Sequence, residues 1–365
     1  MKFKSEKDVF VEALAAAGRV VGRSLGATQG ILLALTGNQL TVTGTDLDIT
    51  TRVNLDVIGF EDGAVLVPAR LLVDAVRTLE AGAVTVETKG DKVEVSLAKT
   101  NYQLNTYALV DFPKLPPVPN PTATLTALDF IEGLSQVVRA TSNDEARPLL
   151  TGVLFTTDEG VIRMVATDSY RLAVRDLNST EKLPASSDLL VPARALNELQ
   201  RAAANLAVDA SIGVATSESE ITFIAGNTSV STRLIDGTYP NFRSLIPSGY
   251  ENQLRIGKDT FMSSLKRMRV LAKDPTSSVR LTLHERNIDI TTQSTEAGVV
   301  ADNVDGDYRG EEMTIAFNPA YLMEGVEAVP GDEVIIEVSD PSKAALLHGV
   351  DETKFRYLLM PVRVQ

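Results

Sequence analysis

The sequence contains no cysteine, no tryptophan and only two histidines among its 365 residues. Without cysteine there can be no disulfide, no thiolate metal ligand and no thiol nucleophile. His284 and His348 stand alone, in no metal-ligand spacing, and read as ordinary strand residues. No P-loop, GxGxxG turn or GxSxG elbow is found. These absences predict a protein that is not an enzyme and uses no metal or cofactor.

Long apolar runs are also missing. No segment is long and apolar enough to span a bilayer, and the start MKFKSEKDVF lacks the apolar core of a signal peptide. We therefore expect a cytoplasmic protein. Its formal net charge of −13 would be unusual for a protein that binds phosphates.

What the sequence does contain is a long repeat. Prolines in matching contexts lie 192 − 68 = 124 and 319 − 192 = 127 residues apart. Two further markers keep nearly the same interval. A period near 120 exceeds the roughly 20 to 50 residues of solenoid repeats, so it indicates three copies of a whole domain. The markers are Val67-Pro68-Ala69-Arg70, Val191-Pro192-Ala193-Arg194 and Asn318-Pro319-Ala320-Tyr321; Thr45-Asp46, Thr167-Asp168 and Thr292-Gln293; and Phe10, Phe130 and Phe261.

Each copy is predicted to be α+β, with the order helix, strands, helix, strands. The opening helix has apolar residues at helical spacing, as in Phe261, Leu265 and Met268. Ser5-x-x-Asp8 and Thr126-x-x-Asp129 resemble capping boxes at the first two helix starts. The three recurring prolines would begin the second helices. Linkers rich in turn residues place the domains at residues 1–120, 121–248 and 249–365.

Three segments carry a resemblance to a known family. They are Val165-Ala-Thr-Asp-Ser-Tyr-Arg-Leu-Ala173, the stretch from Arg233 to Pro247, and the terminal Tyr357-Leu-Leu-Met-Pro-Val-Arg363. Their order and spacing resemble the β sliding clamp of bacterial DNA polymerase III over the whole chain. The resemblance implies three similar domains, each with two helices and two antiparallel sheets. It also implies a head-to-tail homodimer that closes a six-domain ring around duplex DNA and confers processivity.

Simple geometry permits such a ring. A domain of about 120 residues corresponds to a sphere roughly 35 Å across. Three touching spheres leave a hole only about 5 Å wide, whereas six leave one of roughly 35 Å, against about 20 Å for duplex DNA. Encirclement therefore requires two chains.

Basic residues recur on the helix faces opposite the apolar ones, which favours a positively charged inner lining despite the negative total. Any one of them could instead belong to an ordinary solvated face. The predicted DNA-facing set is Arg19, Arg23, Arg70, Arg77, Arg139, Arg194, Arg201, Lys266 and Arg267.

The resemblance also implies a cleft between the second and third domains that takes a short peptide from the replicative polymerase, the clamp loader and other proteins. Without the resemblance, the Leu-Leu-Met-Pro segment could simply be a closing strand. The first copy has Leu47-Asp48 where the second has Ser169-Tyr170-Arg171, so no equivalent peptide site is expected there. The carried-over residues are Leu150, Thr167, Tyr170, Arg171, Leu172, Pro240, Leu245, Asn318, Tyr321, Leu358, Met360, Pro361 and Val362, with Arg171 and the tyrosines as polar anchors at the edge.

The dimer interface follows in the same way: Tyr102 and Leu104 on an edge strand would meet Val270 and Leu271 of the partner, although these residues could instead be core. Two other functions remain open. One is a three-domain scaffold that does not encircle DNA; the other, weaker one is a hydrolase that uses Asp46 and Asp48, carboxylates that the third copy lacks.

Overall fold

A computed structural model describes residues 1–22, 26–158, 160–178, 188–247, 249–272, 277–294 and 298–363. The chain forms two compact units. Unit 1 consists of Met1–Leu128 and Arg194–Leu234, and unit 2 of residues 129–178, 188–193 and 235–363. The second sequence copy is therefore divided between the units, because its strands join sheets of both neighbouring copies.

The described residues form six α-helices, two in each copy, as predicted. The second helices begin one residue after Pro68 and Pro192 but directly at Pro319, which Asn318 caps by accepting from the N–H groups of Ala320 and Tyr321. The helices are α1 (Lys7–Arg19), α2 (Ala69–Thr78), α3 (Ala127–Val137), α4 (Ala193–Ala203), α5 (Lys258–Met268) and α6 (Pro319–Ala328); five 3₁₀ turns are η1 (Ala27–Gln29), η2 (Leu109–Asp111), η3 (Val138–Ala140), η4 (Pro148–Leu150) and η5 (Phe242–Leu245).

The predicted capping box at Ser5 is wrong. Ser5 lies in strand β1, helix α1 starts only at Lys7, and Glu6 precedes it without a side-chain cap. The Ser5 hydroxyl donates instead to the carbonyl of Glu6. Strand pairing with β7 holds Ser5 opposite Val84 and so decides its conformation.

In unit 1 the described strands form two antiparallel sheets. The five-stranded sheet leaves β9 at one edge, and the eight-stranded sheet joins strands of copies one and two where β4 pairs with β17. In spatial order the first is β5 (Ile58–Glu61), β1 (Lys2–Glu6), β7 (Ala83–Lys89), β8 (Lys92–Leu97) and β9 (Thr100–Asn105); the second is β10 (Ala123–Thr126), β15 (Ser211–Thr216), β16 (Glu220–Ala225), β17 (Thr228–Arg233), β4 (Ile49–Asp56), β3 (Gln39–Thr45), β2 (Gly30–Thr36) and β6 (Gly63–Pro68).

Unit 2 repeats this plan in its described strands. A nine-stranded sheet joins copies two and three where β13 pairs with β26, and a four-stranded sheet leaves β21 at its edge. The first runs β14 (Leu189–Pro192), β11 (Gly152–Asp158), β12 (Val161–Thr167), β13 (Arg171–Asp176), β26 (Phe355–Leu359), β25 (Ala345–Gly349), β24 (Glu333–Val338), β18 (Asn252–Gly257) and β22 (Asp307–Arg309); the second runs β21 (Gly298–Asp305), β20 (Asn287–Ser294), β19 (Val279–Leu283) and β23 (Met313–Phe317).

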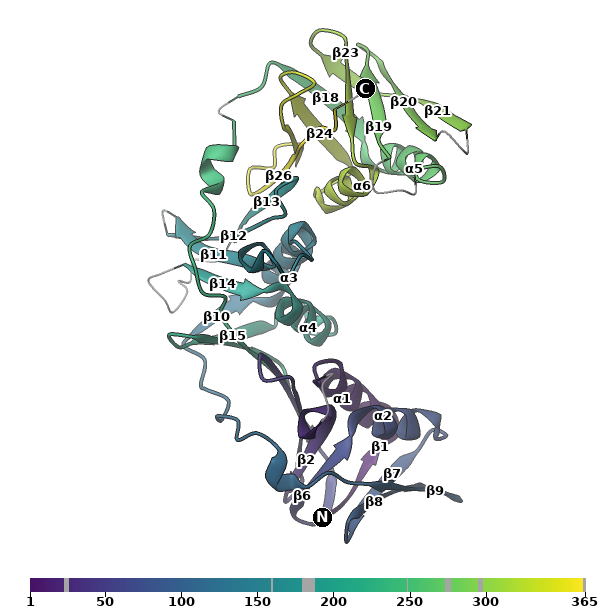
Figure 1. The fold of residues 1–365 in the computed structure, drawn as a ribbon, viewed down its shortest axis with the longest axis vertical. Helices are drawn as coiled ribbons and strands as arrows, with labels where there is room; N and C mark the ends of the chain where they lie inside the picture. Colours follow the sequence, from purple (N-terminus) through teal and green to yellow (C-terminus); the bar gives the residue numbers. More distant parts are fainter. Residues whose placement is uncertain are drawn as a thin grey trace. The chain divides into compact units, whose positions relative to one another are not determined.

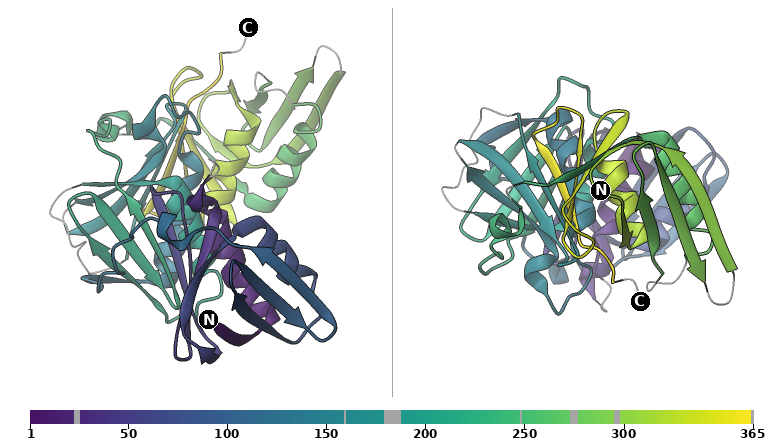
Figure 2. Two further views of the ribbon diagram at one scale, coloured as in Figure 1. Left: turned by 60° about the horizontal axis from the view of Figure 1, so that its bottom comes forward. Right: turned by 90° about the horizontal axis from the view of Figure 1, so that it is seen from above.

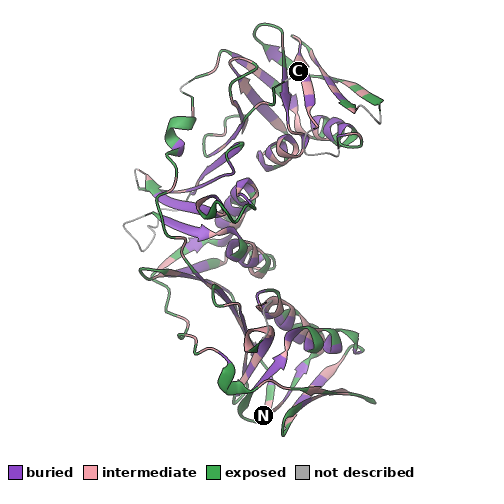
Figure 3. Cartoon of the chain, in the orientation of Figure 1, coloured by how far each residue is buried: buried purple, intermediate pink, exposed green. Residues whose placement is uncertain are grey.

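In each unit a pair of helices packs against both sheets and keeps its other side exposed. Helix α1 contacts α2, strand β1 of one sheet and β2 to β4 of the other, while α5 contacts α6, β18, β20 and β21 (Figures 1 and 2). The apolar sides of the helices are buried, as Figure 3 shows in purple. The predicted key residues Phe10, Phe130 and Phe261 are all buried in these interiors.

A tight turn after the marker Thr-Asp is built identically in copies one and two. Thr45 and Thr167 accept from the N–H two residues ahead, and Asp46 and Asp168 accept from the N–H groups two and three residues ahead. The residue after each aspartate has a positive φ, 81° at Leu47 and 82° at Ser169. The sequence repeat is thus a repeat of backbone geometry.

Candidate peptide-binding surface and DNA-facing residues

The predicted peptide site centres on a cluster of apolar side chains in unit 2, along the seam where β13 meets β26. Leu172 lies opposite Leu358, which in turn lies opposite Leu346 on β25. All three are buried and belong to one cluster with Leu154, Val165, Val174, Leu190 and Phe242. We call Leu172, Leu358 and Leu346 the leucine floor.

Exposed apolar residues lie close in the sequence to members of this cluster: Tyr170 precedes Leu172, Leu245 follows Phe242, and Met360 and Val362 follow Leu358. Tyr170, Leu245, Met360 and Val362 are each at least one-third exposed although they are large and apolar; we call them the rim. Backbone bonds hold the C-terminal rim in place, since the N–H of Met360 donates to the carbonyl of Tyr170 at 2.9 Å and that of Val362 to Ala316 at 2.8 Å. Exposed apolar groups beside a buried apolar cluster are typical of an interaction surface.

Arg171 differs from its prediction. It is only 8% exposed, so it is not a free anchor at the edge. Its guanidinium binds Asp168 at 3.0 Å, forms a short ion pair with Glu324 of α6 and lies 4.3 Å from the centre of the Tyr321 ring. Burial alone would lower the pKa of Arg171, but its contacts with Tyr357 and Glu324 outweigh burial and raise it. Arg171 therefore joins copy two to copy three from inside.

Several other predicted residues shape this surface rather than line it. Thr167 donates to the carbonyl of Arg171 at 2.6 Å and closes the turn that presents Tyr170. Asn318 caps α6 and so fixes Tyr321. Leu150 is buried, and its neighbour Leu149 is the one that packs against the cluster. Pro240 is exposed and Pro361 half-buried.

Sequence reasoning missed Leu149, Leu346, Tyr239, Phe242 and Ile246. The last three lie within the quoted segment Arg233 to Pro247, so the motif itself contained the signal. No sequence signal pointed to Leu346, because only the pairing of β25 with β26 brings it beside Leu358.

Comparisons with known proteins agree with this architecture along the whole chain. Models of the DNA polymerase III beta subunit match residues 1–116 as its N-terminal domain, 124–241 as its central domain and 243–363 as its C-terminal domain. The β sliding clamp of Streptomyces coelicolor is 30% identical over 375 residues that cover 100% of both chains. The chain belongs to the β sliding clamp family. This family consists of non-catalytic replication proteins that confer processivity on DNA polymerase III.

Other clamps support the assignment. The β sliding clamp of Vibrio cholerae is 28% identical and covers 100% of both chains. Among solved structures, the clamp of Bartonella birtlesii, bound to griselimycin, superimposes with a TM-score of 0.93 at 27% identity, and that of Bacillus subtilis with 0.90 at 25% identity. Both superpositions cover 100% of both chains.

The arginines predicted to face DNA in this clamp-family chain fall into two groups. Arg70 and Arg77 on α2, and Arg194 and Arg201 on α4, have side chains at least half exposed. Arg70 and Arg77 share only the exposed Asp74, at 3.9 and 3.7 Å. Lys266 and Arg267 are exposed on α5, where Arg267 forms a short ion pair with Asp302. Arg23 lies outside the described residues.

Arg19 and Arg139, in contrast, join neighbouring copies. Arg19 binds Glu198 of α4 at 2.6 Å, and Arg139 binds Glu327 of α6 at 2.9 Å as well as the carbonyl of Glu324. Both lie nine residues after the key phenylalanine of their copies, so the repeat places them at equivalent junctions. Arg194 and Arg201 are also paired, with Asp46 and Glu198, but their side chains remain at least half exposed. The side chains of Arg19 and Arg139 are only 37% and 25% exposed, and we therefore leave both out of the DNA-binding proposal.

The residues predicted for the dimer interface lie at a sheet edge and after a helix. Tyr102 and Leu104 are on β9, the edge strand, where both also pack partly against the core. Val270 follows α5 and is 63% exposed, and Leu271 is half-buried.

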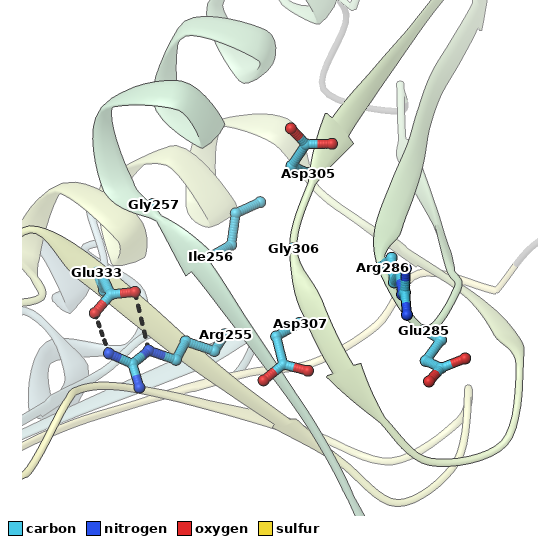
Figure 4. A pocket seen from close by; sticks show the side chains of 9 residues that line it. All are labelled: Arg255, Ile256, Gly257, Glu285, Arg286, Asp305, Gly306, Asp307 and Glu333. Carbon is cyan, nitrogen blue, oxygen red and sulfur yellow. Dashed lines mark hydrogen bonds and ion pairs between the residues drawn. The ribbon is translucent and has the colours of Figure 1, made fainter.

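A cavity of about 480 Å³ in unit 2 has charged walls (Figure 4). Arg255 forms a two-pronged pair with Glu333 there, and Glu285, Arg286, Asp305 and Asp307 also line the cavity. Within the described residues, no group of three or more acidic or histidine side chains is arranged to hold a metal ion. No helix of the described chain is long and apolar enough to cross a membrane.

Proposed function

We propose that two copies of this chain assemble head to tail into a ring that encircles duplex DNA. Each chain of the dimer has one sheet that ends in β9 and another sheet that ends in β21. An edge strand presents unpaired N–H and C=O groups that can add to a strand of another chain. A contact between the β9 edge of one chain and the β21 edge of the other chain is heterologous, and two such contacts close a ring of two chains. These two free edges are the observation that carries the proposal.

The inner surface of the ring is assigned to the exposed arginines of α2 and α4. Arg70 and Arg77, like Arg194 and Arg201, are seven residues apart and therefore lie on one side of their helix. Contacts between arginine side chains and DNA phosphates do not read the base sequence, and they weaken as the salt concentration rises. Loose binding is sufficient, because a closed ring is retained by topology. The excess of negative charge elsewhere disfavours DNA on other surfaces.

The leucine floor and rim are assigned to partner peptides, including those of the replicative polymerase and the clamp loader. A buried apolar cluster gives a peptide side chain an apolar contact, and Met360 can repack around different residues. The Tyr170 and Tyr321 rings provide flat contacts at the edge. Many partners could then use one surface in turn.

Small-angle X-ray scattering on the purified chain tests the ring directly. We expect twice the mass of one chain and the profile of a hollow disc. A solid monomer at micromolar concentration would contradict the ring and favour a scaffold that does not encircle DNA. Loading onto closed circular DNA gives the second test: the protein should stay bound until the circle is cut. Release that does not depend on cutting would contradict encirclement.

A further inference from the structure

Unit 1 contains a cavity of about 610 Å³ at the position that corresponds, by the repeat, to the leucine floor of unit 2. It lies between the turn after Thr45, the proline-rich linker near Pro116 and the strands β15 to β17. Its volume is within the usual range of roughly 300 to 1,000 Å³ for ligand sites. The sequence predicted no peptide site equivalent to that of unit 2 here, and the residues that line this cavity differ in chemistry from the leucine floor.

The strand register allows the cavity of unit 1 and the leucine floor of unit 2 to be compared residue by residue. In unit 2, Leu172 lies opposite Leu358, and Leu358 opposite Leu346. In unit 1, Thr50 lies opposite Ser231, and Ser231 opposite Thr222. The three leucines are thus replaced by three hydroxyl side chains, all of which line the cavity. The Ser231 and Thr222 hydroxyls are 2.9 Å apart, and those of Thr50 and Thr45 are 2.8 Å apart.

Arg52 extends this change from apolar to polar. Arg52 in the first copy is equivalent by the repeat to Val174 in the second copy, which belongs to the apolar cluster of unit 2. Its guanidinium donates to the carbonyl of Pro116 at 2.7 Å, and in the described part of the chain it forms no ion pair. Burial lowers the pKa of Arg52, as expected for a cation that has lost water without gaining an anion. A half-buried cation of this kind favours an anionic ligand.

The other charges of the cavity do not satisfy Arg52. Lys114 and Arg233 also line it, and neither forms an ion pair among the described residues. Of the three lining carboxylates, Asp46 is engaged by its own turn and by Arg194 at 2.8 Å. Asp48 and Glu220 remain, so three cations face two free carboxylates in a chain with a net charge of −13.

The rest of the lining distinguishes a peptide from a nucleic acid. None of the described lining residues is aromatic, so bases would find no stacking platform. Leu47, Leu115 and the linker prolines supply apolar wall instead. We propose that this cavity is a second ligand site, which binds a short acidic peptide through Arg52 and Arg233 and the hydroxyls of Thr50, Thr222 and Ser231. The proposal goes beyond the proposed function, because it concerns unit 1 and does not require the leucine floor to bind anything.

Methyl NMR spectroscopy on the full chain tests the proposal. The probe is the blocked peptide acetyl-Leu-Pro-Glu-Asp-amide, and the signals are the leucine methyls. We expect shifts at Leu47 and Leu115, with Leu172 and Leu358 unchanged. Arg52→Gln should weaken binding at least tenfold, and the exposed Lys99→Gln should not weaken it. Arg233→Gln provides a second variant, because the exposed Arg233 side chain makes no contact comparable to that of Arg52 with Pro116.

The control ligand is the neutral peptide acetyl-Leu-Pro-Gln-Asn-amide. Binding as tight as that of the acidic peptide, or binding unaffected by both arginine variants, would overturn the anion contact. If glutarate or inorganic phosphate binds as tightly as the acidic peptide, the cavity is a site for a small anion and the peptide proposal is overturned. In every case the polymerase peptide is titrated in parallel, and its shifts at Leu172 and Leu358 report on the proposed function separately.

Discussion

Tyr170 and Tyr321 stack on each other with ring centres 6.3 Å apart and planes inclined by 28°. Tyr170 comes from a turn of the second copy and Tyr321 from helix α6 of the third. The guanidinium of Arg171 lies 4.3 Å from the centre of the same Tyr321 ring. The edge of the proposed peptide surface is therefore shaped jointly by two copies, although Tyr170 itself remains 59% exposed.

Replacing Met360 with Asp should weaken binding of the polymerase peptide at least tenfold, because a carboxylate at the rim would have to lose water against apolar side chains. Met360 is 46% exposed, and it is held through its backbone N–H, so the fold should persist. Leu172→Asp should abolish binding too, but it puts a charge at a site only 2% exposed and will also destabilise unit 2. Fluorescence anisotropy gives the affinity. Val350→Asp, at an exposed residue of the same unit, is the matched control; equal loss there would count against the site.

The fold was largely predictable from sequence because it depends on patterns repeated within one chain. Helix faces such as Phe261, Leu265 and Met268 were predicted from spacing alone, and all three are buried. The roles of the charged residues were not predictable. Arg19 and Arg139 were predicted to face DNA like Arg70, and Arg171 to be an anchor at the edge of the peptide cleft, yet each is paired with a carboxylate distant in sequence. Such pairs arise from tertiary contacts, which neither spacing nor composition encodes.

The exposed arginines of α2 should govern the affinity for DNA. Replacing both Arg70 and Arg77 with Gln removes two phosphate contacts, which should reduce the slope of log K against log salt by about 2 for duplex DNA. Filter binding at several salt concentrations measures that slope. Arg309→Gln, an exposed arginine on β22, is the control and should leave the slope unchanged. An unaltered slope in the double variant would remove α2 from the DNA-facing surface.

Dimerisation should be lost in Val270→Glu. Val270 is 63% exposed after α5, so the new carboxylate costs little in the free chain but would be buried in the proposed interface. Tyr102 is a less suitable position, because its hydroxyl bonds with that of Thr78 at 2.9 Å and its replacement would also disturb the fold. Analytical ultracentrifugation should give the mass of one chain for Val270→Glu. Val299→Asp, on the edge strand β21 and 64% exposed, should have the same effect; dimers that persist in both variants would place the interface elsewhere.

His284 should make the stability of the four-stranded sheet depend on pH. Hydrogen bonds with Glu312 and Asp289, at 3.1 and 3.2 Å, raise the pKa of His284 above its ordinary value near 6.5. A raised pKa means that the stabilisation is complete below the pKa of the unfolded chain and is lost as pH rises through the folded value. His284→Gln should therefore lower the melting temperature more at pH 5.5 than at pH 9. A difference between variant and parent that is the same at both pH values would contradict this.

Gly44→Ala should destabilise unit 1 by about 3 kcal/mol or more, because a Cβ at this position would lie 1.9 Å from the carbonyl oxygen of Ala17. That oxygen belongs to the backbone of α1, so either the helix or strand β3 would have to move. Gly18→Ala, in the helix α1 that Gly44 approaches, is the matched control. Its Cβ would meet Val73 at 3.4 Å, which is an ordinary contact. Alanine also favours a helix by up to about 1 kcal/mol over glycine. Urea unfolding should therefore show a large loss for Gly44→Ala and none for Gly18→Ala. Equal midpoints for the two variants would mean that α1 can shift away from the eight-stranded sheet at little cost, and the close approach of Gly44 to Ala17 would then not be what holds the helix against it.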